Sequence, residues 1–138
     1  DSDCDGYTSA ALLINYLNSL FPAYVQNYIT YRVHDDKSHG IKFDTIPTDV
    51  KLVIAPDSSS NDYEVHKQLA ERDCDVLVID HHLADHISEY ACVINNQMCD
   101  YPTKALSGAG VVYKFCCYLD SLLDIDMLIT LWIWQQLV

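Results

Sequence analysis

Three short apolar runs constrain the fold of this chain more than any other feature of its sequence. They read KLVIA (51–55), DVLVI (75–79) and YACVIN (90–95). Each run has the length of one strand, and none shows the regular alternation of a strand with one wet face, so we expect strands that are buried on both faces. Strands that alternate with helical segments predict an α/β fold, with a mostly parallel sheet and helices on both faces.

The first helix is expected directly after the acidic stretch DSDCDG (1–6). Apolar residues recur at helical spacing from Ala10 to Phe21, and Pro22 is expected to close the helix. The next stretch, AYVQNYITYRV (23–33), is rich in β-branched and aromatic residues. This composition predicts a further strand.

Two more helices are expected in the second half of the chain. Asn61 followed by Glu64 resembles a capping box, which predicts a helix from there to about Arg72. SGAGVVYKFCCYL (107–119) passes from a small-residue turn into a helix. The last residues, MLITLWIWQQLV (127–138), are apolar without a clean period. They are expected either to cover the sheet as a helix or to remain an exposed, sticky end.

Composition limits the classes of protein that the chain can belong to. Its 138 residues, of which 50% are apolar, suffice for one domain with its own core. The net charge of −12 argues against a basic nucleic-acid groove, whereas clustered acids can indicate a metal site. No apolar run reaches the roughly 18 residues of a membrane span, and no signal peptide is visible. We therefore expect a cytoplasmic protein without a membrane partner.

The cysteines support the same compartment. None of them forms a C-x-x-C pair, and several lie within apolar runs. We expect reduced, buried thiols rather than a disulfide framework. The cysteines are Cys4, Cys74, Cys92, Cys99, Cys116 and Cys117.

Acidic and histidine clusters follow the expected strands. PDSSSND (56–62) and DHH (80–82) each come after a buried run, and DSDCDG (1–6) opens the chain. Because the carboxyl ends of parallel strands meet at one edge of a sheet, these clusters should converge. Crowded carboxylates repel each other unless a cation lies between them, and Asp and His are suitable ligands for Mn²⁺ or Mg²⁺. The candidates are Asp3, Asp5, Asp57, Asp80, His81 and His82, with Asp1 at the edge.

Four motifs in this order resemble the DHH phosphoesterase family. They are DSDCDG before a helix, PD after a strand, VLVIDHH, and YPTKALSGAGVVYK. DHH alone is a weak signal, but four motifs at plausible spacing are a strong one. The chain is most similar to the RecJ-type single-strand-specific exonucleases, particularly compact versions found in phage, over roughly residues 1–120. The resemblance implies metal-dependent hydrolysis of single-stranded nucleic acid, with a place in DNA repair or recombination.

The resemblance also implies roles for individual residues. Two divalent metal ions, Mn²⁺ or Mg²⁺, would be bound at this site. Asp3 and Asp5 match the family's D-x-D ligands, one to each metal, and Asp1 matches an additional acid of RecJ-like members. Asp57 matches the carboxylate that bridges the metals, and His81 matches the metal-binding histidine.

Further residues match positions that handle the substrate. His82 would contact the scissile phosphate, and Asp80 would orient the histidine pair. Open backbone N–H groups at the start of the SGAG helix could receive a phosphate; the residues concerned are Ser107, Gly108, Ala109 and Gly110. The loop HDDKSHG (34–40) lies where the family has a loop over the site, which makes Lys37 and His39 weaker candidates.

Simpler readings of the same residues stay open. The three N-terminal acids could form a solvated turn that caps a helix, and Asp57 could be an ordinary turn residue. His81 and His82 could be loop histidines, and the SGAG glycines could serve only close packing of a helix. Cys4 is left out of the metal site because alternation in an extended chain would turn it away from its neighbours. The remaining candidates for surface positions are His34, His66 and His86.

The chain departs from the family pattern near its end. The family has a further metal-ligand aspartate after the SGAG helix, whereas this chain has no acid after Asp126. We also expect the chain to lack the family's second, substrate-gripping domain. Our hypothesis is that residues from about Met127 onward come from a frameshift or a sequencing error, because another reading frame can encode a family-like segment. We therefore divide the chain into a DHH domain (1–120), truncated at both ends, and an apolar tail (121–138).

These observations predict a truncated, RecJ-like phosphoesterase domain whose exonuclease activity is impaired. One alternative is a phosphodiesterase or pyrophosphatase of the same superfamily that acts on small substrates. Another is a non-catalytic remnant that binds a partner protein through its apolar tail. The sequence does not name a protein partner.

Overall fold

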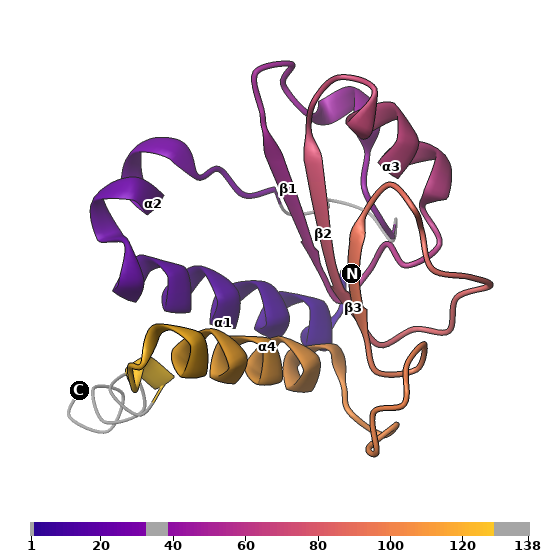
Figure 1. Ribbon diagram of the computed structural model, residues 1–138. Coiled ribbons are helices and arrows are strands. Elements are labelled where there is room, and N and C mark those ends of the chain that lie inside the picture. Colours follow the sequence, from indigo (N-terminus) through magenta and orange to yellow (C-terminus); the bar gives the residue numbers. More distant parts are fainter. Residues whose placement is uncertain (1, 33–38, 129–138) are drawn as a thin grey trace.

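The structure is a computed structural model that describes residues 2–32 and 39–128. Its centre is a parallel sheet of three strands in the order β1-β2-β3 (Figure 1). The strands are β1 (Leu52–Pro56), β2 (Asp75–Asp80) and β3 (Cys92–Asn95). All three coincide with the apolar runs, because a parallel strand covered on both faces needs apolar side chains at nearly every position.

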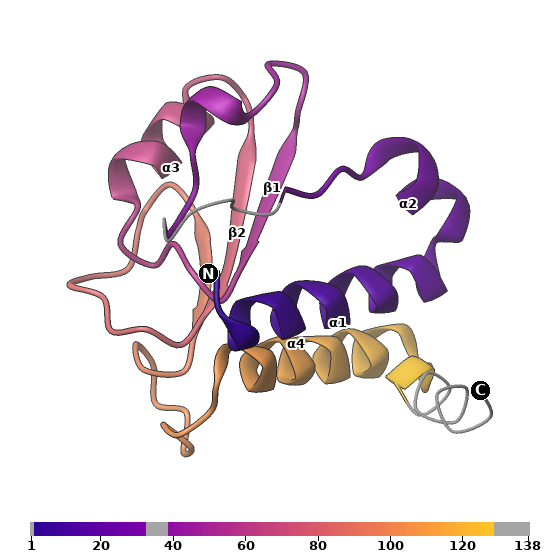
Figure 2. The same ribbon diagram turned by 180° about the vertical axis from the view of Figure 1, so that it is seen from behind.

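Helices cover both faces of the sheet (Figures 1 and 2). On one face α1 (Cys4–Leu20) and α4 (Gly108–Leu123) lie side by side and run in the same direction. On the other face lies α3 (Tyr63–Ala70), next to the short 3₁₀ helix η1 (Phe43–Thr45). The predicted α/β class, with a parallel sheet between helices, is confirmed.

The central strand β2 serves two hydrophobic cores because its side chains alternate between the faces. Val76 and Val78 pack with Leu69 of α3. Leu77 and Ile79 pack on the opposite side, in the core that α1 and α4 share. Burial of each such aliphatic side chain contributes about 1.5–3 kcal/mol, so the two cores fix the helices on their faces.

A strand was expected after Pro22, and this expectation is wrong. Pro22 does follow the end of α1, but it also begins a second helix, α2 (Pro22–Tyr28). Proline at the first helical turn has no N–H to lose and a backbone angle that suits the helix. The rings of Tyr24 and Tyr28, four residues apart, contact each other with centroids 4.9 Å apart. No residue of α2 is buried, so the β-forming residues have no sheet to pack on.

The expected capping box at the start of α3 does not form either. The helix begins after Asp62, whose side chain makes no capping hydrogen bond. Its carboxylate instead accepts the backbone N–H of Ile41 at 2.8 Å. The side chain of Asn61 bonds the backbone of the 83–85 loop rather than the helix of Glu64. Tertiary contacts have replaced the local cap.

His66 was expected at the surface and is fully buried, with 0% exposure. It precedes Leu69 by three residues, so both side chains lie on the inner face of α3. Neither ring nitrogen has a hydrogen-bond partner among the described residues. His86 is exposed as expected, and His34 lies outside the described residues.

All six cysteines are free, as expected. Only Cys74 and Cys116 are buried, however, whereas Cys4, Cys92 and Cys99 are exposed. The expectation of buried thiols is therefore wrong for these three. In the part of the chain that the structure describes, no helix is long and apolar enough to cross a membrane.

The end of α4 is fastened to the core. The helix continues past the predicted segment 107–119 to Leu123. The buried carboxylate of Asp120 accepts a hydrogen bond from the Tyr16 hydroxyl at 2.6 Å and another from the N–H of Leu128 at 3.1 Å. Met127 and Leu128 pack against the core that α1 and α4 share. The rest of the apolar tail, 129–138, lies outside the described residues.

The C-cap of α4 offers a test of its backbone conformation. Asp124 has φ 53° and ψ 47°, a left-handed conformation that costs a non-glycine residue about 1 kcal/mol. We predict that Asp124→Gly raises the free energy of unfolding by about 0.5–1 kcal/mol in a urea titration. The matched control Ser121→Gly, within the exposed part of the same helix, should lower it by about 0.5 kcal/mol. A loss of stability in both variants would contradict this assignment.

Burial of His66 predicts that the folded protein loses stability at acidic pH. Burial lowers the pKa of its ring below the ordinary value of 6.5, although the charge of Asp62 acts in the opposite sense. The unfolded chain therefore binds a proton that the folded chain does not, so stability falls as the pH drops below about 6.5. We expect His66→Leu to flatten the dependence of unfolding free energy on pH between about 7.5 and 5. The exposed control Gln68→Leu should keep the parent's dependence, and an unchanged slope in His66→Leu would refute the prediction.

Candidate metal site

The carboxyl edge of the sheet gathers the predicted acids and histidines. Asp57 follows β1 directly, while Asp80 is the last residue of β2 and leads into His81 and His82. The first turn of α1 brings Asp5 to the same edge. His81 lies near two of the carboxylates, since its Nε2 is 3.2 Å from Oδ1 of Asp57 and 3.6 Å from Oδ2 of Asp5. Convergence of these segments is what parallel pairing of β1 and β2 requires.

Asp57 is the most constrained residue of the cluster. Its side chain is 1% exposed, and its backbone has φ 59°, which is uncommon for a residue other than glycine. The backbone N–H continues the sheet pairing by donating to the Ile79 carbonyl at 2.8 Å. Neither carboxylate oxygen accepts a hydrogen bond from the described residues. A buried carboxylate without donors is costly, so a cation is the natural partner for this one.

Charge and burial act together on Asp57. Burial raises the pKa of its carboxyl to about 6, and the negative charge of Asp5 acts in the same direction, while His81 opposes both. The Asp57 carboxylate, His81 and the neighbouring His82 each offer one ligand atom, and these atoms lie within 4.8 Å of one another. The donor set of carboxylate oxygen and imidazole nitrogen therefore fits a divalent metal ion.

Asp5 has partners that Asp57 lacks. Its carboxylate accepts the N–H groups of Gly108 at 2.7 Å and Ala109 at 3.0 Å, at the N-terminus of α4. Burial alone would raise the pKa of Asp5, but these hydrogen bonds, the Ser107 hydroxyl and the nearby His81 hold it below its ordinary value. The positive end of the helix dipole favours the charged form as well. Asp5 is thus a carboxylate held in its ionised state.

Position 108 has no room for a side chain, because Asp57 lies against it. A Cβ atom at this position would lie 2.0 Å from Oδ1 of Asp57, far inside the contact distance of real atoms. The glycine at the start of α4 therefore lets the helix approach the buried carboxylate. Close packing, the simpler role considered for the SGAG glycines, therefore applies to Gly108, which packs against Asp57 of the candidate site.

Asp80 forms hydrogen bonds with both histidines. Its Oδ1 accepts the N–H groups of His81 at 2.7 Å and His82 at 3.2 Å, and it lies 2.7 Å from Nδ1 of the His82 ring. Its Oδ2 accepts the N–H of Ser60 at 3.1 Å. Burial acts to raise the pKa of Asp80, but the hydrogen bonds from Ser60, His82 and the backbone outweigh it and lower the pKa. Because an ionised carboxylate only accepts, we infer that Nδ1 of His82 carries the hydrogen and Nε2 faces outward.

Asp3 has a hydrogen bond of its own at the start of α1. Asp3 caps α1, since its Oδ1 accepts the N–H of Gly6 at 2.9 Å, and its side chain is exposed. Cys4 is the first residue of α1 and is exposed, so the alternation that we expected for it does not apply. His39 is exposed in the segment after the undescribed loop. Asp1 and Lys37 lie outside the described residues.

The N–H groups at the start of α4 are not open, contrary to our expectation. Gly108 and Ala109 donate to Asp5, and the N–H of Gly110 donates to the Ser107 hydroxyl at 3.3 Å, which caps the helix. A phosphate could reach the first two groups only after Asp5 leaves them. Their role in phosphate binding stays a prediction. Ser60, whose N–H donates to Asp80, was not among the predicted residues. Its place shortly after Asp57 could have indicated a contact with the site.

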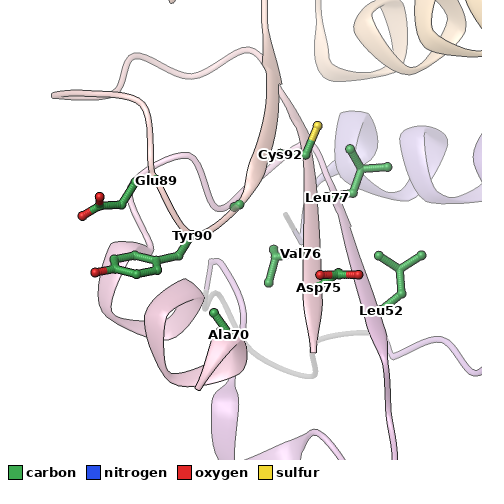
Figure 3. A pocket seen from close by; sticks show the side chains of 9 residues that line it. Leu52, Ala70, Asp75, Val76, Leu77, Glu89, Tyr90 and Cys92 are labelled. Atoms are coloured by element: carbon green, nitrogen blue, oxygen red, sulfur yellow. The ribbon is translucent and has the colours of Figure 1, made fainter. Parts of the chain in front are cut away.

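A large hollow lies at the opposite end of the sheet (Figure 3). Its volume is about 560 Å³, and Leu52, Asp75 and Cys92, the first residues of the three strands, line it together with Tyr90. Since the strands are parallel, this hollow is at the amino edge, away from the acidic cluster. It contributes no residue to the candidate site.

A comparison of the sequence with protein families identifies the family of the chain. Residues 1–131 match the DHH family, N-terminal domain. The chain belongs to the DHH family. This result agrees with the resemblance that the four motifs indicated.

Curated DHH relatives include exonucleases of phage and bacteria. The chain is 48% identical over 125 residues to the "Putative SPbeta prophage-derived single-strand DNA-specific exonuclease YorK" of Bacillus subtilis (strain 168). The aligned residues make up 90% of this chain and 21% of that protein. It is 30% identical over 120 residues to the "Single-stranded-DNA-specific exonuclease RecJ" of Haemophilus influenzae, covering 82% and 20%. The RecJ of Escherichia coli is 25% identical over 130 residues. The chain thus spans about a fifth of the length of these relatives.

The contact between Gly108 and Asp57 generates a prediction for the DHH domain. Gly108→Ala forces a methyl group against a buried carboxylate, which should lower the free energy of unfolding by about 1–3 kcal/mol in urea. The control is Gly110→Ala, two residues further along α4. There the nearest atom is the flexible end of Leu106 at 3.3 Å, so little change is expected. Equal effects in the two variants would contradict the proposed close approach at Gly108.

Proposed function

We propose that this chain is the metal-binding part of a phosphoesterase that hydrolyses phosphodiester bonds in single-stranded DNA. One observation carries the proposal: the buried carboxylate of Asp57 has no hydrogen-bond donor among the described residues, and it shares with Asp5 the proximity of one His81 nitrogen. A fold that buries such a carboxylate at the carboxyl edge of a parallel sheet is prepared for a cation and its ligand.

The metal ligands that we propose are Asp5, Asp57 and His81, with Asp3 and Asp1 as further ligands. The two oxygens of Asp57 allow it to serve two ions, and oxygen and imidazole donors suit Mn²⁺ or Mg²⁺. When bound, such ions supply Lewis-acid stabilisation of the phosphoryl group and activate water. The identity and number of the ions are part of the proposal.

His82 is proposed to contact the scissile phosphate. Its side chain is 49% exposed, so it can reach a substrate, whereas its Nδ1 is tied to the buried Asp80. The outward Nε2 is then the atom that faces a phosphate oxygen, to which it can donate a hydrogen bond when the ring carries a hydrogen on both nitrogens. Asp80 fixes the direction of the ring and so limits the entropy lost when the ring meets its substrate.

The substrate class is inferred from the relatives. The names of YorK and RecJ specify single-strand DNA, and we extend this specificity to the present chain. An acidic chain with net charge −12 is a poor match for a long polyanion, which keeps a small phosphodiester or pyrophosphate as the second candidate.

Metal binding is tested first by stability. Asp57→Asn removes a buried charge without donors, so we expect the metal-free variant to unfold at a higher urea concentration than the parent. The parent should gain stability with Mn²⁺, by about 2.7 kcal/mol at a hundred times the dissociation constant, whereas the variant should gain far less. The control Asp124→Asn changes charge equally at the far end of α4 and should keep the full gain. An equal gain with Mn²⁺ in the parent and in Asp57→Asn would refute the site.

Hydrolysis is tested separately with end-labelled oligonucleotides. With Mn²⁺, we expect the parent to shorten a single strand stepwise and to leave the matching duplex intact. Asp57→Asn should abolish this activity, whereas Asp124→Asn should preserve it. Turnover only of a small phosphodiester would favour the second candidate. Metal binding without any hydrolysis would leave a non-catalytic remnant and overturn the proposed activity, though not the metal site.

A further inference from the structure

Asn95 joins the two loops that carry the candidate site. It is the last residue of β3 and is 4% exposed. Its amide nitrogen donates to the hydroxyl of Ser60 at 2.9 Å and to the backbone carbonyl of His82 at 2.8 Å. Its amide oxygen accepts the N–H of Gln97 at 2.8 Å. Both hydrogens of the amide are thus used, one for each loop.

These contacts reach the groups that matter for the site. Ser60 lies three residues after Asp57, and its own N–H donates to Asp80. His82 is bound to Asp80 through its ring. The side chain of Asn95 therefore closes a buried network that runs from the end of β1, through the end of β2, to the end of β3.

We propose that Asn95 is a positioning residue for His82. It fixes the backbone of His82 at the carbonyl, while Asp80 fixes the ring at Nδ1. Two fixed points on one residue define the direction of the outward Nε2, which a single contact would leave free to swing. The inference rests on the proposed function, in which His82 faces the scissile phosphate.

The amide is the side chain that this position needs. A carboxylate has the same shape and still accepts the N–H of Gln97, but it has no hydrogen to donate and would face the carbonyl oxygen of His82. A hydroxyl side chain is shorter and offers a single hydrogen. Asn95→Asp is therefore a sharp test, because it removes the bond to His82 and leaves packing nearly unchanged.

The chain offers a matched control in the next residue. Asn96 is also 4% exposed, and its amide donates to the carbonyl of Thr103 at 3.0 Å, away from the cluster. Asn96→Asp makes the same chemical change at equal burial. A general cost of placing a carboxylate here would appear in both variants, whereas a positioning effect on His82 would appear only in Asn95→Asp.

The primary readout is the long-range nitrogen NMR spectrum of the imidazole rings in the whole, metal-free chain at one fixed pH. We expect the His82 signals of the parent and of Asn95→Asp to differ, with loss of the pattern of a fixed Nδ1–H tautomer in the variant. Asn96→Asp should keep the parent's pattern. Because this measurement needs no turnover, it is decided independently of whether the chain is a nuclease.

Two further measurements complete the test. Ser60→Ala removes one anchor of the Asn95 amide and should give a smaller change in the His82 signals, so it decides the question if Asn95→Asp does not fold. If the parent hydrolyses single-stranded DNA, Asn95→Asp should lower kcat by about tenfold or more, with Mn²⁺ affinity close to that of the parent. Unchanged His82 signals in every folded variant would overturn the inference, whatever the activity.

Discussion

Two hydrogen bonds from the N-terminus of α4 to the carboxylate of Asp5 connect residues more than a hundred positions apart in the sequence. They bring the first turns of α1 and α4 together at the carboxyl edge of the sheet. Gly108, which supplies one of these N–H groups, then lies against Asp57 with no room for a side chain. The direction of two helices, the place of the buried carboxylate and the approach of His81 all depend on this joint.

The carboxylates of Asp5, Asp57 and Asp80 differ in the hydrogen-bond donors that compensate their negative charge. Asp5 is compensated by the amides of a helix start, and Asp80 by the N–H groups of Ser60, His81 and His82. Of the three, Asp57 has no donor within residues 2–32 and 39–128, although it is as deeply buried as Asp80. A buried, unsatisfied carboxylate costs stability, and the fold retains it at the position where a cation would do most to offset that cost. The candidate metal site is therefore marked by an uneven distribution of hydrogen-bond donors and not only by a collection of acids.

Much of the fold followed from the sequence where one signal dominated. Buried parallel strands must be apolar at nearly every position, so the three runs identified the sheet, and the rule for strand ends brought Asp57 and His81 together. The strand expected after Pro22 was wrong because β propensity describes residues on a half-buried sheet, and Tyr24 and Tyr28 have none to pack on. His66 was misplaced because a helix as short as α3 gives a weak periodic signal. Asn95 ends a buried strand as well, and the same rule would have found it had amides been counted.

The acidic balance of the chain limits how a nucleic acid could be held. Eight lysines and arginines stand against 20 acids, so little of the surface can replace the counterions of a long DNA track. Under the function that we propose, attraction for a phosphodiester would come mainly from the site edge, where cations beside Asp57 would reverse the local sign. Such an arrangement concentrates affinity on the one phosphate that reacts and leaves the rest of the strand weakly held. Under the same proposal, discrimination between single strands and duplexes would depend on shape near this edge rather than on charge along the surface.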